Sequence, residues 1–127
     1  MYIHSPNRTL AKSLSQDEIA TLDLLAYLYL KYGQVHQACV YLKFLISLCP
    51  RSARLHRSYA LALLTNGATE EAEQFASISL ELAASPVERA VAHLILCFVF
   101  HKLGRFLDAE ISSAQFILER SQMSTTL

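Results

Sequence analysis

Each of the three glycines in this chain is followed five residues later by an alanine. The pairs are Gly33 and Ala38, Gly67 and Ala72, and Gly104 and Ala109. Successive glycines are 34 and 37 residues apart. Glycine suits the end of a helix because the chain leaves through a left-handed residue, which only glycine adopts without steric cost. Alanine suits the point where a second helix crosses the first, because a larger side chain would separate them. The pattern predicts an all-α fold of three helical hairpins.

A period near 34 with this spacing is typical of tetratricopeptide repeats. The residues that match the repeat pattern are Leu22, Leu25, Ala26, Tyr29, Gly33, Ala38, Leu42 and Pro50 in the first copy, Tyr59, Ala60, Leu63, Gly67, Ala72 and Ser79 in the second, and Leu96, Cys97, Phe100, Gly104 and Ala109 in the third. Repeats of this kind stack into a short right-handed solenoid with a concave groove that holds another polypeptide. The pattern therefore favours a binding protein and argues against an enzyme.

Capping and helix-breaking residues divide the chain further. Ser15 with Glu18, and Ser85 with Glu88, form capping-box patterns, the second with Pro86 at the first helical position. We expect helices over residues 16–32, 35–49, 52–66, 70–84, 86–103 and 106–120, with Thr69 as the N-cap of the fourth. The predicted organisation is an N-terminal arm (1–14), a repeat domain (15–121, with repeats at about 19–52, 53–85 and 86–121) and a frayed C-terminal tail (122–127).

The share of charged residues in this chain is low. Asp, Glu, Lys and Arg make up 17% of the 127 residues, against roughly 25% in typical soluble chains. A small repeat protein exposes much surface, so few charges suggest that part of the surface is covered by a partner or by a second copy. Eleven basic residues match eleven acidic ones, which does not favour nucleic acid as the partner.

Two features bear on the compartment. The longest apolar run, residues 94–100, is too short to span a bilayer, and residues 1–14 contain no apolar block of signal-peptide length. Cys39, Cys49 and Cys97 are odd in number and lie in apolar helical stretches, which favours reduced thiols packed in a core. We therefore expect a cytosolic protein without disulfides.

The repeat register predicts which residues of each first helix line the groove. An amphipathic helix or an extended apolar segment would bury the apolar members, while the two arginines would pair with acids of the ligand and set its direction. The predicted partner-binding residues are Leu24, Tyr27, Leu30, Arg54, Arg57, Leu61, Leu64, Leu94, Ile95 and Phe98. The alternative is that these residues pack against neighbouring helices or against a second copy of the chain.

Other kinds of site find little support in the sequence. His93, Cys97 and His101 share one helix face, but the two histidines are about 12 Å apart along a helix, too far for one metal ion. The sequence contains no glycine-rich phosphate loop and no hydrolase or metalloprotease motif. Asp23 stands where repeat domains that clamp a chaperone's terminal carboxylate need a cation, so that ligand is disfavoured. We expect no catalytic residue, cofactor or metal.

One stretch goes beyond a generic repeat. It runs from Leu28 to Pro50 and reads LYLKYGQVHQACVYLKFLISLCP, followed by ALALLTN at residues 60–66 and EEAE at 70–73. A glycine, an Ala-Cys pair five and six residues later, and a leucine-rich helix that ends in proline resemble the YscY (SctY) chaperones of bacterial type III secretion. The resemblance covers residues 19–85. It implies a chaperone of the bacterial cytoplasm that forms a heterodimer with a small export-apparatus protein, YscX (SctX), without a membrane span.

Two further functions remain open from the sequence. One is a translocator chaperone of the SycD/LcrH type, a three-repeat relative with a longer N-terminal helical region. The other is a scaffold that assembles with itself through the same groove when no partner is present. The identity of the client separates the first from the YscY-like function, and a stable oligomer of the lone chain would indicate the second.

Overall fold

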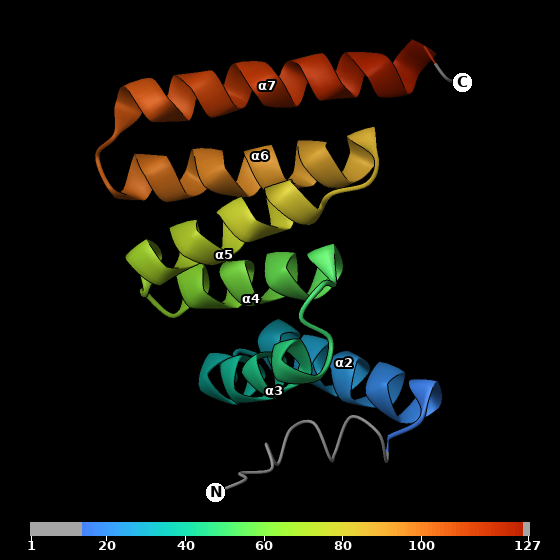
Figure 1. Ribbon diagram of the computed structural model, residues 1–127. Helices are drawn as coiled ribbons and strands as arrows, with labels where there is room; N and C mark the ends of the chain where they lie inside the picture. The colour runs from blue at the N-terminus through green and yellow to red at the C-terminus, as the bar shows by residue number, and fades with distance from the viewer. Residues whose placement is uncertain (1–13, 126–127) are drawn as a thin grey trace, which may run out of the picture. The chain divides into compact units, whose positions relative to one another are not determined.

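The computed structural model describes residues 14–125, which form six helices and no strand. In chain order the helices are α2 (Gln16–Lys31), α3 (Val35–Leu48), α4 (Ala53–Thr65), α5 (Thr69–Leu82), α6 (Pro86–Lys102) and α7 (Phe106–Thr125) (Figure 1). The contacts divide the chain into two compact units, residues 1–51 and 52–127. The boundary between the units falls one residue from the predicted border between the first two repeats. The prediction of an all-α fold is confirmed.

The three glycine turns have the same backbone geometry. Gly33, Gly67 and Gly104 have φ values of 81°, 87° and 75°. In the first turn the amide of Gly33 donates to the Leu30 carbonyl (3.3 Å) and that of Gln34 to the Tyr29 carbonyl (2.8 Å). The other two turns repeat this pair of bonds, which satisfies carbonyls at the helix end. A Cβ at any of the glycines would meet nothing within 4 Å, so the backbone conformation selects glycine here.

The alanines that follow these glycines are packed in the hairpins. Ala38, Ala72 and Ala109 are 0%, 0% and 1% exposed. Each lies in the first turn of the second helix of its hairpin. The predicted role of the alanine, a small side chain that lets two helices approach closely, agrees with this burial.

The helix starts follow the sequence signals at two of three places. At α2, Ser15 Oγ accepts from the Glu18 amide (3.1 Å) and Glu18 Oε1 accepts from the Ser15 amide (2.9 Å), which completes a capping box. At α6, Ser85 caps in the same way, but Glu88 Oε1 accepts from the Ala84 amide (3.1 Å), one residue further back.

The prediction for the start of α5 is wrong. Thr69 is the first residue of α5 and Ala68 is the N-cap, without a side-chain hydrogen bond. The reason lies in the preceding turn, where the Ala68 amide donates to the Leu63 carbonyl (2.9 Å). The chain thus enters α5 directly from the glycine turn, one residue earlier than the capping preference of threonine indicates.

In the first unit, α2 packs against α3. Ala26 of α2 and Leu42 and Leu45 of α3 are buried, and the rings of Tyr29 and Tyr41 stack with centroids 5.5 Å apart. Tyr32 is 75% exposed because it is the C-cap residue, beyond the last full turn of α2.

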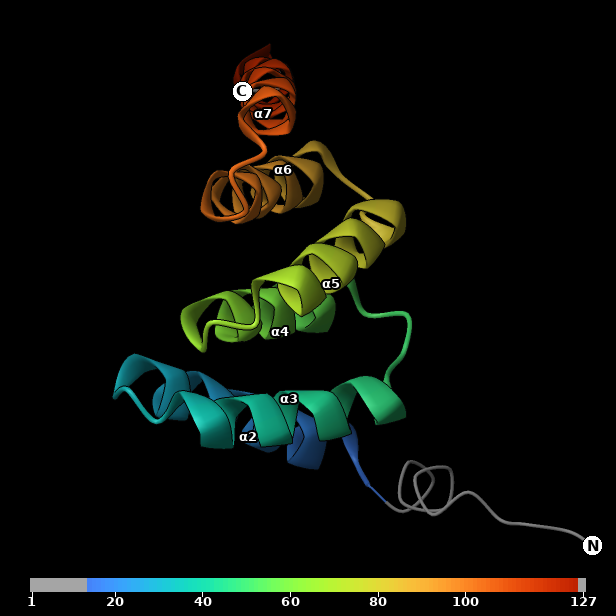
Figure 2. The same ribbon diagram turned by 90° about the vertical axis from the view of Figure 1, so that its left-hand side faces the viewer.

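In the second unit, each helix packs against the next, and α4 also contacts α6. Consecutive helices run in opposite directions, so α4 and α6 run the same way, as Figure 1 and the turned view of Figure 2 show. The largest buried side chains include Leu55 in α4 and Val99 in α6. The buried His56 lies 5.9 Å from the ring of Phe75, and its Nδ1 is 2.8 Å from the Ser52 carbonyl oxygen.

The ends of the chain differ from the prediction where the structure describes them. Helix α7 continues to Thr125, so residues 122–125 of the expected frayed tail are helical. No glycine or proline follows Arg120 to end the helix. The expected N-terminal arm, apart from Leu14, and the last two residues lie outside the described part of the chain.

Candidate protein-binding surface

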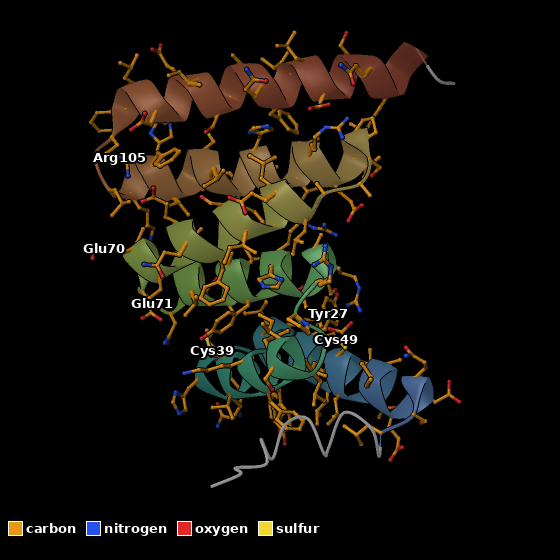
Figure 3. The ribbon with its side chains drawn as sticks, in the orientation of Figure 1. Tyr27, Cys39, Cys49, Glu70, Glu71 and Arg105 are labelled. Atoms are coloured by element: carbon orange, nitrogen blue, oxygen red, sulfur yellow. The ribbon has the colours of Figure 1, made fainter. Side chains whose placement is uncertain are left out.

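The predicted binding residues of α2 are largely available to a partner. Leu24 and Tyr27 are 57% and 58% exposed, and Leu30 is half-buried. Leu24 and Tyr27 are three residues apart and therefore neighbours on one face of the helix. This face belongs to the first unit; Tyr27 is labelled in Figure 3.

Helix α6 carries a longer apolar stripe. The predicted residues Leu94 and Phe98 are 37% and 56% exposed, and Val87 and Val91 are 56% and 38% exposed. The spacing of these four residues is four, three and four, which places them on one face of the helix. The two valines were not among the predicted binding residues, although the same spacing counted backward from Phe98 reaches both.

Helix α4 adds one leucine and two arginines beside this stripe. Leu61 is 44% exposed, Arg54 is exposed and Arg57 is half-buried. Arg57 Nη1 donates to Glu88 Oε2 at 3.3 Å, which joins the early turns of α4 and α6. Leu61 lies one turn beyond Arg57 on the same face of α4, and α4 contacts α6. We use the name α4–α6 surface for the following residues of these two helices: Arg54, Arg57, Leu61, Val87, Val91, Leu94 and Phe98.

Two of the predicted binding residues on α4 and α6 are not part of this surface. Leu64 and Ile95 are only 8% and 7% exposed and belong to the core of the second unit. The helical period explains the difference. Leu64 is four residues from the buried Ala60, and Ile95 is four residues from the buried Val99, so each shares the inward side of its helix. At these two positions the repeat register assigned core residues to the groove.

Charge on the α4–α6 surface is concentrated at one end. Glu88 accepts from the Ala84 amide and from Arg57, and these donors, the amide foremost, hold the pKa of its carboxyl below the ordinary value of 4.5. Glu88 thus balances Arg57. Arg54 lies one turn earlier in α4, at the same end of the surface.

A shallow depression at the start of α5 has a different character. It encloses about 360 Å³ and is lined by Gly67, Ala68, Thr69, Glu70, Glu71 and Leu103. Nearby, Arg105 donates to Asp108 Oδ2 and to Glu73 Oε1, both at 2.9 Å. These bonds, that to Asp108 foremost, raise the pKa of Arg105 above its ordinary value. Figure 3 shows Arg105 with Glu70 and Glu71 on one side of the unit. Glu70 and Glu71 lie in the first turn of α5, where their charges favour the positive end of the helix dipole. This role is structural.

Cysteine and histidine side chains do not gather into a site. Within residues 14–125, no group of three or more His, Cys, Asp or Glu side chains could hold a metal ion. Cys39, Cys49 and Cys97 are outside any disulfide and half-buried, so they are less deeply buried than the predicted core thiols. His101, expected on the same face as His93, lies edge-on to Phe106 with centroids 5.7 Å apart.

Comparison with known proteins adds no assignment. No model of a protein family and no curated protein matches the chain. Among residues 14–125, no helix has the length and apolar character that a membrane span requires.

Proposed function

We propose that this protein is a tetratricopeptide-repeat chaperone of bacterial type III secretion, similar to YscY (SctY). In this proposal it binds a small export-apparatus protein of the YscX (SctX) kind in the bacterial cytoplasm and keeps it soluble until use. The protein acts by binding alone and catalyses no reaction. The observation that carries the proposal is the exposed apolar α4–α6 surface with arginines at one end.

The repeat geometry supports the tetratricopeptide part of the proposal. Three hairpins share the same glycine turn, with positive φ and the same two hydrogen bonds, and the same buried alanine. In the second unit the first helix of one hairpin contacts the first helix of the next, α4 against α6. Stacked repeats make this contact, and the row of first helices is the surface on which such arrays hold a ligand.

The chemistry of the α4–α6 surface supports a polypeptide ligand. Leu61, Val91, Leu94 and Phe98 would each contribute about 1.5–3 kcal/mol if fully covered, less the part that is already buried. An amphipathic helix suits such a stripe because its apolar residues recur with the same spacing.

The secretion-specific part of the proposal depends on the resemblance of residues 19–85 to YscY-type chaperones. A translocator chaperone of the SycD/LcrH type is the second candidate, because it would use the same apolar surface for a client with membrane-inserting segments. The low share of charged residues suits either one, since both functions leave a covered apolar surface in the complex.

The test is co-expression with each small secretion protein encoded nearby, followed by size-exclusion chromatography with light scattering. A one-to-one complex with a small soluble client supports the proposal, and a client with membrane-inserting segments supports the translocator function. A chain that binds none of them contradicts both.

Single substitutions locate the binding surface. Leu61→Glu and Phe98→Glu should abolish binding while helicity by circular dichroism is retained, because a carboxylate would be buried against the client without a partner. Leu107→Glu is the matched control, since Leu107 is 71% exposed and lies on α7, outside the α4–α6 surface. Normal binding by the first two variants would place the client elsewhere.

A further inference from the structure

Helix α7 buries two small residues and exposes five large apolar ones. Ala109 and Ser112 are 1% and 6% exposed where α7 packs against α6. Leu107, Ile111 and Leu118 are 71%, 53% and 56% exposed. A surface helix normally turns its polar side to water. Large apolar residues on the outer side of α7 indicate that this side is covered in the functional protein.

The exposed residues form one regular stripe. Leu107, Ile111, Ala114 and Leu118 are spaced by four, three and four residues, the spacing of a seam between two paired helices. Ile117, 60% exposed, lies along its edge. We call these five residues the α7 stripe. It is separate from the α4–α6 surface, so the inference drawn from it does not depend on the proposed function.

We propose that the α7 stripe is a self-association surface on which two copies of the chain pair through antiparallel α7 helices. The arrangement of the stripe fits a second copy because it is self-complementary about its middle. The midpoint of Ile111 and Leu118 lies beside Ala114. With a two-fold axis there, Ile111 of each copy packs against Leu118 of the other, and the two small Ala114 residues meet at the closest approach of the helices.

Charge also favours a second copy over a different partner. The stripe contains no charged residue, whereas the α4–α6 surface has Arg54 and Arg57 beside its apolar residues. The chain has a formal net charge of zero at pH 7, so two copies do not repel each other as they approach. A partner that covers such a surface therefore needs no charge complementary to it.

The area of the stripe predicts the strength of the dimer. Together with Phe106, which is 61% exposed, the stripe offers roughly 400–500 Å² per copy, or roughly 1,000 Å² for the pair, at the lower limit for a specific interface. The expected dimer is therefore weak and depends on concentration, with dissociation in the micromolar range or above.

The test is sedimentation equilibrium of the full chain from about 1 to about 200 µM, a range that spans such a dissociation constant. We expect the mass to rise from the 14.2 kDa of the monomer toward twice that value. Leu118→Glu and Ile111→Glu should each weaken the dimer at least about tenfold, because both place a carboxylate in the apolar seam. Phe98→Glu is the control on the α4–α6 surface and should leave the dimer intact. A monomer throughout the range, or a dimer that only Phe98→Glu disrupts, overturns the proposal.

Cross-linking tests the antiparallel register. In a chain whose three cysteines are replaced by serine, Ala114→Cys should form a disulfide-linked dimer on mild oxidation, because the two-fold axis brings this position next to itself. Ser121→Cys alone should not form one, since the axis carries the two copies of residue 121 to opposite ends of the seam. If Ser121→Cys links as readily as Ala114→Cys, the helices are parallel and the proposed register is wrong.

Discussion

Helices α4 and α7 belong to the same unit but distribute their apolar residues in opposite ways. Helix α4 buries large side chains, among them Leu55, Tyr59 and Leu63, each at most 5% exposed. Helix α7 buries Ala109 and Ser112 and leaves Leu107 and Leu118 more than half exposed. Both helices contain leucines at helical spacing. The sequence patterns of the two helices are therefore similar, but the burial of their large apolar residues differs.

The difference separates residues that stabilise the fold from residues that bind. A buried leucine of α4 such as Leu55 has lost its contact with water within the chain and contributes to the stability of the unit. A leucine on the outer side of α7 can contribute only when a second molecule covers it. Substitutions in the two helices should therefore divide between loss of stability and loss of association.

The largest effect is expected for Leu55→Ala in α4. Leu55 is 1% exposed, so its truncation leaves a cavity and should lower the free energy of unfolding by about 2–5 kcal/mol. Leu118→Ala in α7 removes the same atoms and should change it by about 0.5 kcal/mol or less. Urea unfolding followed by circular dichroism, at a concentration where the chain is monomeric, measures both. Equal losses for the two variants would show that the outer side of α7 is covered within one chain.

A medium effect is expected when a larger side chain is placed in the hairpins. Ala72→Leu and Ala109→Leu both enlarge a residue that is at most 1% exposed, and each should lower the free energy of unfolding by about 1–3 kcal/mol by forcing helices apart. The α6–α7 hairpin, with small residues on the buried side of α7, should lose as much as the α4–α5 hairpin. A neutral Ala109→Leu would indicate loose packing of α7, contrary to its burial. Ala114→Leu, at an exposed position of α7, is the control.

A smaller effect is expected at the glycine turns, and it should be the same at α4 and α7. Gly67→Ala and Gly104→Ala each place a Cβ on a residue with φ near +80°, at a cost of about 1–2 kcal/mol. No atom lies within 4 Å of either added Cβ, so only the backbone term contributes. Thermal unfolding of both variants measures it. Clearly unequal losses would mean that one turn relaxes away from the left-handed conformation.

The sequence predicted the fold well because its signals were local. The three glycine turns follow from a backbone conformation that other residues avoid, and five of the six helices have bounds within two residues of the prediction. The errors arose where the local signal was weak. Nothing after Arg120 stops a helix, so α7 extends to Thr125, and the turn before Thr69 starts α5 without a polar cap.

The candidate surface was less predictable because burial depends on contacts between distant residues. The repeat register selected both the exposed Leu61 and Leu94 and the buried Leu64 and Ile95. Residues only one to three positions apart on a helix can therefore differ between core and surface. The valines of α6 and the α7 stripe were also missed. Their spacing is visible in the sequence, but only the packing of α6 and α7 shows which side of each helix faces outward.

The smallest effect is expected for the pH dependence of stability. It involves His93 of α6 and the nearby Glu119 of α7. Burial lowers the pKa of His93 from its ordinary value of 6.5, which nearby Glu119 opposes and Arg89 reinforces. Glu119 Oε2 accepts from Arg89 Nε at 2.8 Å, and Glu119 Oε1 is buried without a partner among the described residues. Below pH 6.5 the unfolded chain binds a proton at His93 before the folded chain does. Stability is therefore full above pH 6.5 and falls as the pH is lowered through the folded pKa.

His93→Gln should remove this part of the pH dependence, since glutamine does not titrate. Urea unfolding of the wild type and the variant at pH 7.5 and at pH 5.5 measures the difference. Glu18 and Glu88, whose pKa values lie below 4.5, also stabilise the fold only when ionised, but that stability is lost as the pH falls below 4.5. The interval chosen therefore isolates the histidine from the helix caps. If the variant loses as much stability as the wild type between the two pH values, His93 is not the titrating group, and the contact between α6 and α7 is as insensitive to pH as the apolar packing of α4.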